Sequence, residues 1–400
     1  MGITISGVGS SLLDLIYTDI DFGSRAFEKL STKRPGDGGL VPGGLVFAED
    51  LERFADTPLH HILETITGKS GPDSINLGGP AVAALVNAAR LCHGHAIDIR
   101  FFAMRGNDAV GGRIERILSQ TAVNIDHYLI SDGATPATVV LSDSSYGGGA
   151  GERSFINTLG VAATYGAENL NSGFFDADLL FFGGTAIVPE IHARLDDLLQ
   201  RGKANGCLNV VATVYDFKSE HRNPGASWPL VSRTENLQLI DLLIMNGLEA
   251  CRISGKSRPA DAAAHFAAKG VGTILITRGS DPVLAYSNGS LFEAAELRTL
   301  PVSDHLSQAL LSGQCPNGDT TGCGDNFAGG VLADMAIQLQ TRAPGILDFN
   351  QACAWGICSG GLAGTYAGGV CMEKQPGEKA LRLQPFVDRY LRQIEKGAEK

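Results

Sequence analysis

Long apolar runs and paired cysteines are both missing from this sequence of 400 residues. No uninterrupted apolar run approaches the roughly 20 residues that a membrane-spanning helix needs, so we expect no membrane span. The eight cysteines include no CxxC pair and no regular spacing, which argues against a structural zinc site and against a disulfide framework. Reduced thiols in the cytoplasm are therefore the expected state.

Positive charge is also scarce. Lys and Arg total 32 against 43 Asp and Glu, which gives a formal net charge of -11. A field of this sign repels nucleic acid and anionic membranes, so we expect neither as a partner. The first residues, MGITISGVGSSLL, contain no basic region and no cleavage site of a secretory signal. We therefore expect a cytoplasmic chain that is neither exported nor inserted into a membrane.

Glycine, by contrast, is plentiful, with 51 residues, many of them at the ends of apolar runs. In the middle of the chain such runs recur about every thirty residues, with helical segments between them, at 178–183, 208–215, 241–245 and 272–277. This is the spacing of βαβ units, in which parallel strands are joined by right-handed crossovers. The sequence therefore predicts an α/β fold with a mostly parallel central sheet.

Two segments interrupt this pattern. Residues 19–47 are rich in turn-forming residues, and residues 137–156 look like a hairpin with a glycine-rich tip. A chain of this length can form one large α/β domain that carries insertions. We predict a single domain over 1–400, with these two segments forming a small β lid.

A glycine turn at the start of an apolar helix is the strongest chemical signal. Gly322, Cys323 and Gly324 lead into this helix, and Asp325 falls in its first turn. A helix N-terminus offers unpaired N–H groups and the positive end of the helix dipole to an anion, so a phosphate is the expected ligand. Phosphoryl transfer also needs an acceptor for the hydroxyl proton, which Asp325 could be. The alternative is structural, with Asp325 capping the helix and the glycines forming a tight turn.

Two other phosphate-binding patterns are incomplete. A dinucleotide-binding loop would need a third glycine where Leu12 ends the GVGSSL segment. The GKS triplets at 68–70 and 255–257 lack the glycine five places upstream, because Leu63 and Ala250 stand there. A dehydrogenase and a P-loop NTPase are therefore both disfavoured.

The segment DTTGCGDNFAGG at 319–330 closely resembles the C-terminal signature of the PfkB, or ribokinase-like, family of carbohydrate and nucleoside kinases. The Gly78–Gly79 pair, the turn at 106–111 and the Asn246-x-x-Glu249 motif resemble other segments of that family, in the same order. The resemblance covers nearly the whole chain and implies a ribokinase-like three-layer sandwich. It also implies an ATP- and Mg²⁺-dependent kinase that phosphorylates an alcohol group of a sugar or nucleoside.

The resemblance assigns a role to each matching residue. Asp325 would be the general base, and Gly322, Cys323 and Gly324 would form the anion hole. The resemblance implies that substrate is bound by Asp14, Gly78, Gly79 and the lid residue Arg153. It implies that the nucleotide is bound by Asn246, Glu249, Thr277 and Gly279, with Glu249 also holding magnesium through water. Asp319 would bind a monovalent cation such as K⁺. A purely structural acid is the alternative for Asp319, and an exposed surface charge is the alternative for Arg153.

Substrate identity stays open at this point. The long N-terminal insertion and the ERSFINTLGVAATY stretch at 152–165 resemble adenosine-kinase-like members. Ala83 departs from them, because the family often has a substrate-contacting asparagine at its place. A non-enzymatic sugar- or nucleoside-binding regulator is the alternative function, since a fold does not fix its function. Some relatives pair through their lids, so the resemblance makes a homodimer the candidate assembly.

Overall fold

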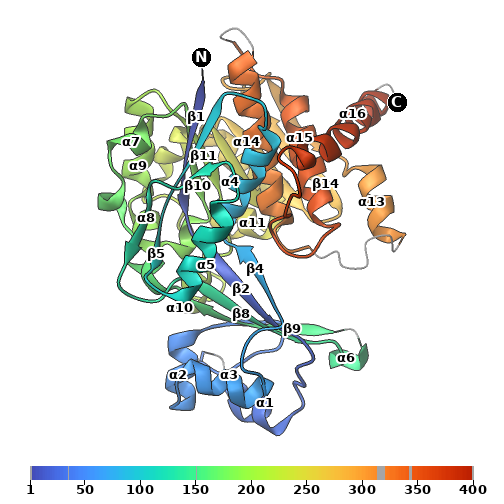
Figure 1. The fold of residues 1–400 in the computed structure, drawn as a ribbon. Coiled ribbons are helices and arrows are strands. Elements are labelled where there is room, and N and C mark those ends of the chain that lie inside the picture. Colours follow the sequence, from blue (N-terminus) through green and yellow to red (C-terminus); the bar gives the residue numbers. More distant parts are fainter. Residues whose placement is uncertain (1, 35, 150, 313–319, 342–344, 399–400) are drawn as a thin grey trace.

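A central sheet of mostly parallel strands runs through the computed structural model, which describes residues 2–34, 36–149, 151–312, 320–341 and 345–398 (Figure 1). The parallel strands are β1 (Ile3–Gly9), β5 (Ile97–Gly106), β6 (Val123–Asn124), β7 (Tyr128–Ser131), β10 (Leu179–Gly183), β11 (Leu208–Ala212), β12 (Leu242–Asn246) and β13 (Thr273–Arg278). Two antiparallel strands, β14 (Asp281–Ser287) and β15 (Ala295–Leu300), complete one edge. Within the described residues the order is β15-β14-β13-β12-β11-β10-β1-β5-β6, with β7 also paired to β5.

The four strands predicted from the apolar runs are β10 to β13, which lie side by side in parallel. Successive residues of these strands face two different cores. In β10, for example, Leu179 and Phe181 pack into one core, whereas Leu180 and Phe182 pack into the other. Strands buried on both faces need continuous apolar sequence, which explains why the runs were visible in the sequence.

Helices cover both faces of the sheet and complete the predicted three-layer sandwich. One core is closed by α4 (Pro80–Leu91), α5 (Ala109–Leu118), α13 (Asp304–Leu311), α14 (Cys323–Thr341), α15 (Phe349–Ala363) and α16 (Glu378–Ala398). The other core is closed by α7 (Ser172–Phe175), α8 (Pro189–Ala193), α9 (Leu195–Ala204), α11 (Gly247–Ser254) and α12 (Pro259–Ala268). Shorter elements are α10 (Phe217–Arg222) and the 3₁₀ helices η1 (Gly160–Ala163), η2 (Ala167–Asn169), η3 (Thr185–Ile187) and η4 (Thr234–Leu239).

A second sheet projects from the first, at the bottom of Figure 1. Its order is β3-β9-β8-β2-β4, with β2 (Leu12–Tyr17), β3 (Leu45–Phe47), β4 (Ser74–Gly78), β8 (Ala137–Asp143) and β9 (Glu152–Thr158). The helices α1 (Arg25–Leu30), α2 (Ala48–Ala55) and α3 (Leu59–Thr67) pack on it around a third apolar core. The short α6 (Tyr146–Gly149) forms the glycine-rich tip between β8 and β9.

The composition of this second sheet differs in part from the prediction. The segment 137–156 forms the expected hairpin of β8 and β9. The segment 19–47 supplies one three-residue strand and one helix, because its turn formers make loops. Two further strands, β2 and β4, come from outside the predicted segments. The lid function of this sheet remains a prediction.

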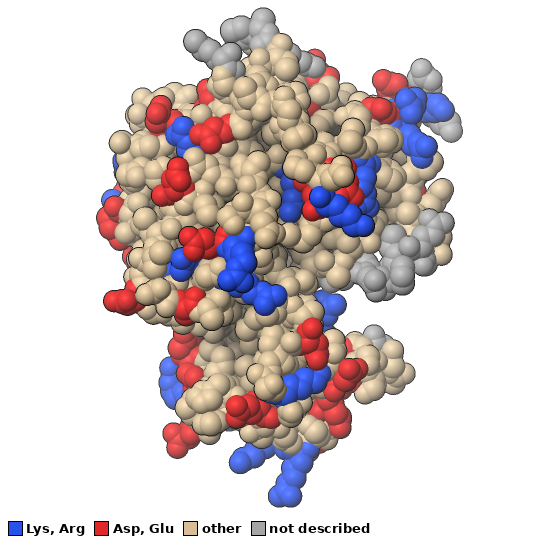
Figure 2. All heavy atoms as spheres, viewed as in Figure 1, with Lys and Arg blue, Asp and Glu red and all other residues tan. Residues whose placement is uncertain are grey.

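Acidic and basic side chains are interspersed over the face of the molecule drawn in Figure 2. Among the helices in the described ranges, none combines the length and the apolar character needed to cross a bilayer.

Candidate active site

The turn that leads into α14 requires glycine at position 322. The φ angle of Gly322 is 74°, and a Cβ atom there would lie 2.4 Å from the Cα atom of Gly369. Its carbonyl oxygen accepts a hydrogen bond from the Asn326 N–H, at 2.8 Å. The N–H groups of Gly324 and Asp325 lie in this first turn, where amides point out from the helix end. The Cys323 N–H donates to the Thr320 carbonyl oxygen at 3.3 Å, so it would have to exchange this partner to bind an anion. The local geometry therefore suits an anion.

Three of the predicted substrate residues, Asp14, Gly78 and Gly79, lie near one end of the β2–β4 pair of the second sheet, where β2 begins two residues after β1. Asp14 in β2 pairs with Asn76 in β4. Gly78 lies directly beside the Asp14 side chain, since a Cβ atom on it would lie 2.6 Å from a carboxylate oxygen of Asp14. Gly79 has a φ of 103°, and a Cβ atom there would lie 2.5 Å from the carbonyl oxygen of Ser10. The diglycine thus lets the chain pass directly beside the Asp14 carboxylate.

The loop after α15 joins these two groups of residues. A Cβ atom on Gly368 would lie 2.7 Å from Nδ2 of Asn76, the residue opposite Asp14. The next residue, Gly369, packs against Gly322 at the glycine turn. The loop therefore connects the glycine turn to the strand pair that carries Asp14, through Gly368 and Gly369.

Asp325 has an unusual electrostatic environment. Its side chain is only partly exposed. Burial, and next the negative charge of Glu249, raise the pKa of Asp325 to about 7. A carboxyl group with a pKa near the working pH can take up and release a proton efficiently, which is the property of a general base.

Asn246 and Glu249 form a capping box at the start of α11. The Asn246 side chain accepts a hydrogen bond from the Glu249 N–H at 2.9 Å, and Oε2 of Glu249 accepts one from the Asn246 N–H at 3.1 Å. The carboxylate also accepts bonds from Asn246 Nδ2 at 2.7 Å and from Thr213 Oγ1 at 2.6 Å. Burial raises the pKa of Glu249, while these hydrogen bonds oppose the rise.

This donor set fits a magnesium ion held through water better than one bound directly. A carboxylate has about four acceptor positions, and three are occupied in Glu249 by Thr213 and Asn246. Mg²⁺ usually keeps several of its waters. One remaining acceptor position on Glu249 can bind such a water. In the described part of the chain, no three His, Cys, Asp or Glu side chains form a dedicated metal cluster.

Thr277 and Gly279 lie beside this capping box at the same edge of the sheet. Thr277 is in register with Asn246 across the β12–β13 pair. Gly279 has a φ of 65° in the turn between β13 and β14, and no atom lies within 4 Å of a Cβ placed on it. Among the described residues the space beside Gly279 is therefore free, and its use by a nucleotide remains a prediction.

The structure does not bring Arg153 to the other predicted substrate residues. Arg153 is exposed on β9 opposite Ser142, whereas Asp14 lies opposite Thr138. Four residues along a strand correspond to roughly 13 Å. A contact between Arg153 and substrate would therefore need movement of the lid sheet, and it remains a prediction. Asp319 lies outside the described residues.

The sequence analysis missed the polar residues that support the glycine turn from behind. Nδ2 of Asn326 donates to the carbonyl oxygens of Gly322 and Gly369, both at 2.8 Å. Its Oδ1 accepts a hydrogen bond from Lys379 at 2.7 Å. Asn326 could have been noticed as a polar residue in an apolar helix. Lys379 could not, because it stands in the charged and turn-forming segment EKQPGEK at 373–379, where an exposed lysine is the ordinary expectation.

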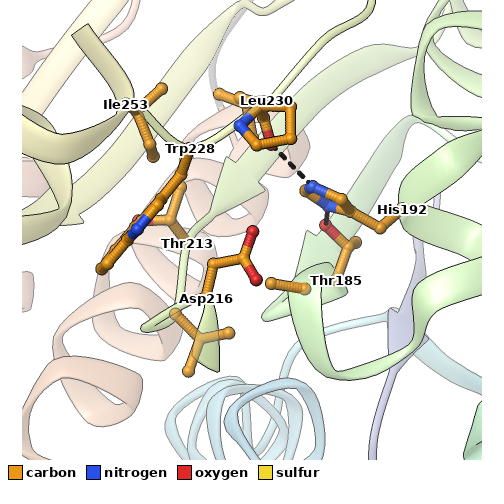
Figure 3. Close-up of a pocket in the computed structure, with 10 residues that line it drawn as sticks. Thr185, His192, Thr213, Asp216, Trp228, Leu230 and Ile253 are labelled. Atoms are coloured by element: carbon orange, nitrogen blue, oxygen red, sulfur yellow. Dashed lines mark hydrogen bonds between the residues drawn. The ribbon is translucent and has the colours of Figure 1, made fainter. Parts of the chain in front are cut away.

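A small cavity of about 10 Å³ lies beyond the ends of β10 and β11 (Figure 3). Asp216 and Trp228 line it together with His192, whose ring bridges Thr185 Oγ1 at 2.8 Å and the Pro229 carbonyl oxygen at 2.7 Å. A cavity of this size holds about one water molecule. It is too small for a sugar or nucleoside. Substrate binding near Asp14 and Asp325 remains a prediction.

Comparisons with known proteins agree with this architecture. Adenosine kinase from Schistosoma mansoni, solved with 2-fluoroadenosine, superimposes with a TM-score of 0.65 at 16% identity, over 93% of this chain and 98% of that one. Ribokinase from Thermotoga maritima gives 0.60 at 16% identity, over 97% and 100% of the two chains. An E. coli protein assigned as ribokinase II, solved with ATP and Mg²⁺, gives 0.63 at 17% identity, over 97% and 100%. The profile of the pfkB family of carbohydrate kinases matches residues 64–354, and the chain therefore belongs to this family.

Proposed function

We propose that this protein transfers the γ-phosphoryl group of ATP to a hydroxyl group of a sugar or nucleoside. One observation carries the proposal: a glycine turn at a helix start, a carboxyl group with a pKa of about 7 in that turn and a second carboxylate beside a diglycine are connected through the loop at 368–369. The family and the ATP and Mg²⁺ bound by the E. coli protein support it.

Each group has one task in this reaction. The carboxylate of Asp14 accepts hydrogen bonds from substrate hydroxyls and so orients them. Asp325 removes the proton from the reacting hydroxyl, whose oxygen forms a bond to the γ-phosphorus while the bond to the leaving ADP oxygen breaks. The N–H groups of 322–325 stabilise the negative charge on the transferred group. Bound Mg²⁺, held through water at Glu249, would neutralise charge on the phosphates.

A panel assay tests this function. Sugars and nucleosides are each incubated with ATP, Mg²⁺ and K⁺, and ADP formation and phosphorylated product are both measured. K⁺ is included because we propose Asp319 as a ligand for a monovalent cation. Product from at least one sugar or nucleoside is expected. Binding of these compounds without any product would favour a non-enzymatic binding protein. A homodimer and a cytoplasmic location remain predictions.

The pKa of Asp325 predicts the pH dependence of turnover. Below its pKa of about 7, Asp325 is protonated and cannot accept the substrate proton, so kcat/KM should rise as the pH increases toward about 7. Removing the charge of Glu249 with Glu249→Gln should move this rise to lower pH, because that charge raises the pKa of Asp325. The exposed Glu235 provides the control, Glu235→Gln. An unmoved profile in Glu249→Gln would contradict the electrostatic coupling.

Closure of the second sheet over the site is a further expected result. Kinases exclude water from the transferred group, and a mobile lid is the usual means. Hydrogen exchange in 19–47 and 137–156 should slow when an accepted substrate binds, whereas exchange in β11 and β13 should change little. Arg153→Ala should alter KM or kcat if closure brings this side chain to substrate. Identical exchange with and without substrate would rule out closure.

A further inference from the structure

One charged side chain is buried directly behind the glycine turn without a role in the proposed reaction. Lys379, near the start of α16, is 2% exposed. Its ammonium group donates to Oδ1 of Asn326 at 2.7 Å and to the hydroxyl of Tyr366 at 2.9 Å. Burying a charge is costly unless it is well paired, so this arrangement requires an explanation.

No carboxylate in the described ranges of the chain lies within 4.0 Å of this ammonium group. The nearest acidic candidate, Glu373, uses its carboxylate differently. It accepts a hydrogen bond from the Lys379 backbone N–H at 2.6 Å and lies 3.7 Å from Nε of Arg90. The positive charge of Lys379 is therefore directed at two neutral groups, Asn326 and Tyr366.

This contact, together with the longer one from the Tyr366 hydroxyl at 3.2 Å, favours one orientation of the Asn326 amide. A lysine ammonium can only donate, so it selects the oxygen of the amide and turns the nitrogen to the opposite side. On that side Nδ2 of Asn326 donates to the carbonyl oxygens of Gly322 and Gly369. Lys379 thus holds together the glycine turn and the loop that connects it to the Asp14 side of the site.

We propose that Lys379 is a positioning residue for phosphoryl transfer, which acts through Asn326 on the turn at 322–325 and adds positive charge behind the anion site. The turn is rigid only if Gly322 keeps its contact with Gly369, and the Asn326 amide bridges those two residues. The catalytic part of this inference rests on the proposed kinase function.

The ionisation of Lys379 is consistent with this role. Burial lowers its pKa to about 7. The titratable or charged groups that surround it are Arg90 from α4, Cys323 from α14 beside Tyr366, Tyr366, Cys371 and Glu373 from the loop after α15, and Arg382 from α16. The charge on Lys379 is therefore lost as the pH rises above about 7, and kcat/KM should decline there.

Lys379→Met tests the proposal, with the exposed Lys374→Met as the matched control. The unfolded chain binds a proton at Lys379 up to a pKa near 10.5, so a buried charge at neutral pH costs stability. Lys379→Met should therefore not lower the melting temperature, and Tyr366 can still donate to Oδ1 of Asn326 at 3.2 Å. We expect kcat to fall about tenfold or more, with a smaller change in KM, because a small misplacement of a catalytic turn is costly.

Lys379→Arg provides a second test of the proposal. Arginine keeps its charge at all accessible pH values, so it should restore part of kcat and abolish the decline above pH 7. A purely structural lysine would give a different result. Lys379→Met would then lower the melting temperature, and the pH profile of the remaining activity would match the wild-type profile. That result, or an unchanged kcat in Lys379→Met, would overturn the proposal.

Hydrogen exchange separates this inference from the kinase function itself. Amides in the peptide 320–328 should exchange faster in Lys379→Met than in the wild type, whereas those of β11 should not change. This hydrogen-exchange measurement needs no substrate. If the wild type phosphorylates no compound of the panel, the proposed function fails, and faster exchange would still support the positioning of the turn by Lys379. Unchanged exchange in 320–328 would refute that positioning whether or not the protein is active.

Discussion

Asp325→Asn is expected to fold normally and to lose roughly 10²-fold or more in kcat, the usual contribution of a positioned general base. Asparagine has nearly the same shape as aspartate but cannot accept the substrate proton. The substitution also removes a largely desolvated carboxyl group whose charged form is disfavoured, so the melting temperature should not fall. Steady-state kinetics and thermal unfolding of the same preparation measure both effects.

The exposed Asp132 offers a matched control, since Asp132→Asn makes the same chemical change at a residue outside the predicted site. This variant should keep its full turnover. A folded Asp325→Asn protein with near-normal kcat would remove Asp325 from the mechanism and leave it as a helix-start residue. The acidic limb of the pH profile would then need another titrating group.

Gly322→Ala should be the second severe change. The new Cβ atom would lie 2.4 Å from the Cα atom of Gly369, at a φ of 74° that disfavours side chains. The turn must shift, and a displacement of about 1 Å at catalytic groups can cost roughly 10²-fold in rate. We also expect a destabilisation of about 1 to 3 kcal/mol from backbone strain. Kinetics and denaturant unfolding test both parts.

Two controls separate the causes. Gly206 has a φ of 78°, and no atom of the described residues lies within 4 Å of a Cβ placed on it. Gly206→Ala therefore imposes the dihedral strain without the collision and should keep turnover. Cys323→Ala should keep most of the activity, because the backbone N–H and not the thiol is proposed to bind the anion. If Cys323→Ala were as damaging as Asp325→Asn, the thiol would have a chemical role. If Gly322→Ala were harmless, the turn would not be the anion site.

The sequence predicted the layered fold well for a physical reason. Strands such as β10 and β12 are buried on both faces, so their apolar runs show their position without knowledge of their partners. The second sheet was harder to predict. Its strand β2 follows β1 after two residues, and only its pairing with β4 and β8 assigns it to another sheet. Such pairing is non-local and leaves little trace in local sequence.

The same distinction applies to the site. Gly322 and Asp325 lie in one short motif, so their proximity was readable from the sequence. The connection of Gly322 to Asp14 depends on Gly368 and Gly369, which lie in a loop far along the chain. Lys379 gave no signal, because burial of a charged side chain is decided by the packing of α16 and the loop before it.

Transfer of label from [γ-³²P]ATP tests the central claim most directly. The wild-type protein is incubated with a substrate from the panel, Mg²⁺ and K⁺, and the labelled products are separated. The account predicts label on a hydroxyl oxygen of the sugar or nucleoside, with little label in inorganic phosphate, and loss of this product in Asp325→Asn. Label found only in inorganic phosphate, or an equal yield of labelled product from Asp325→Asn, would contradict it.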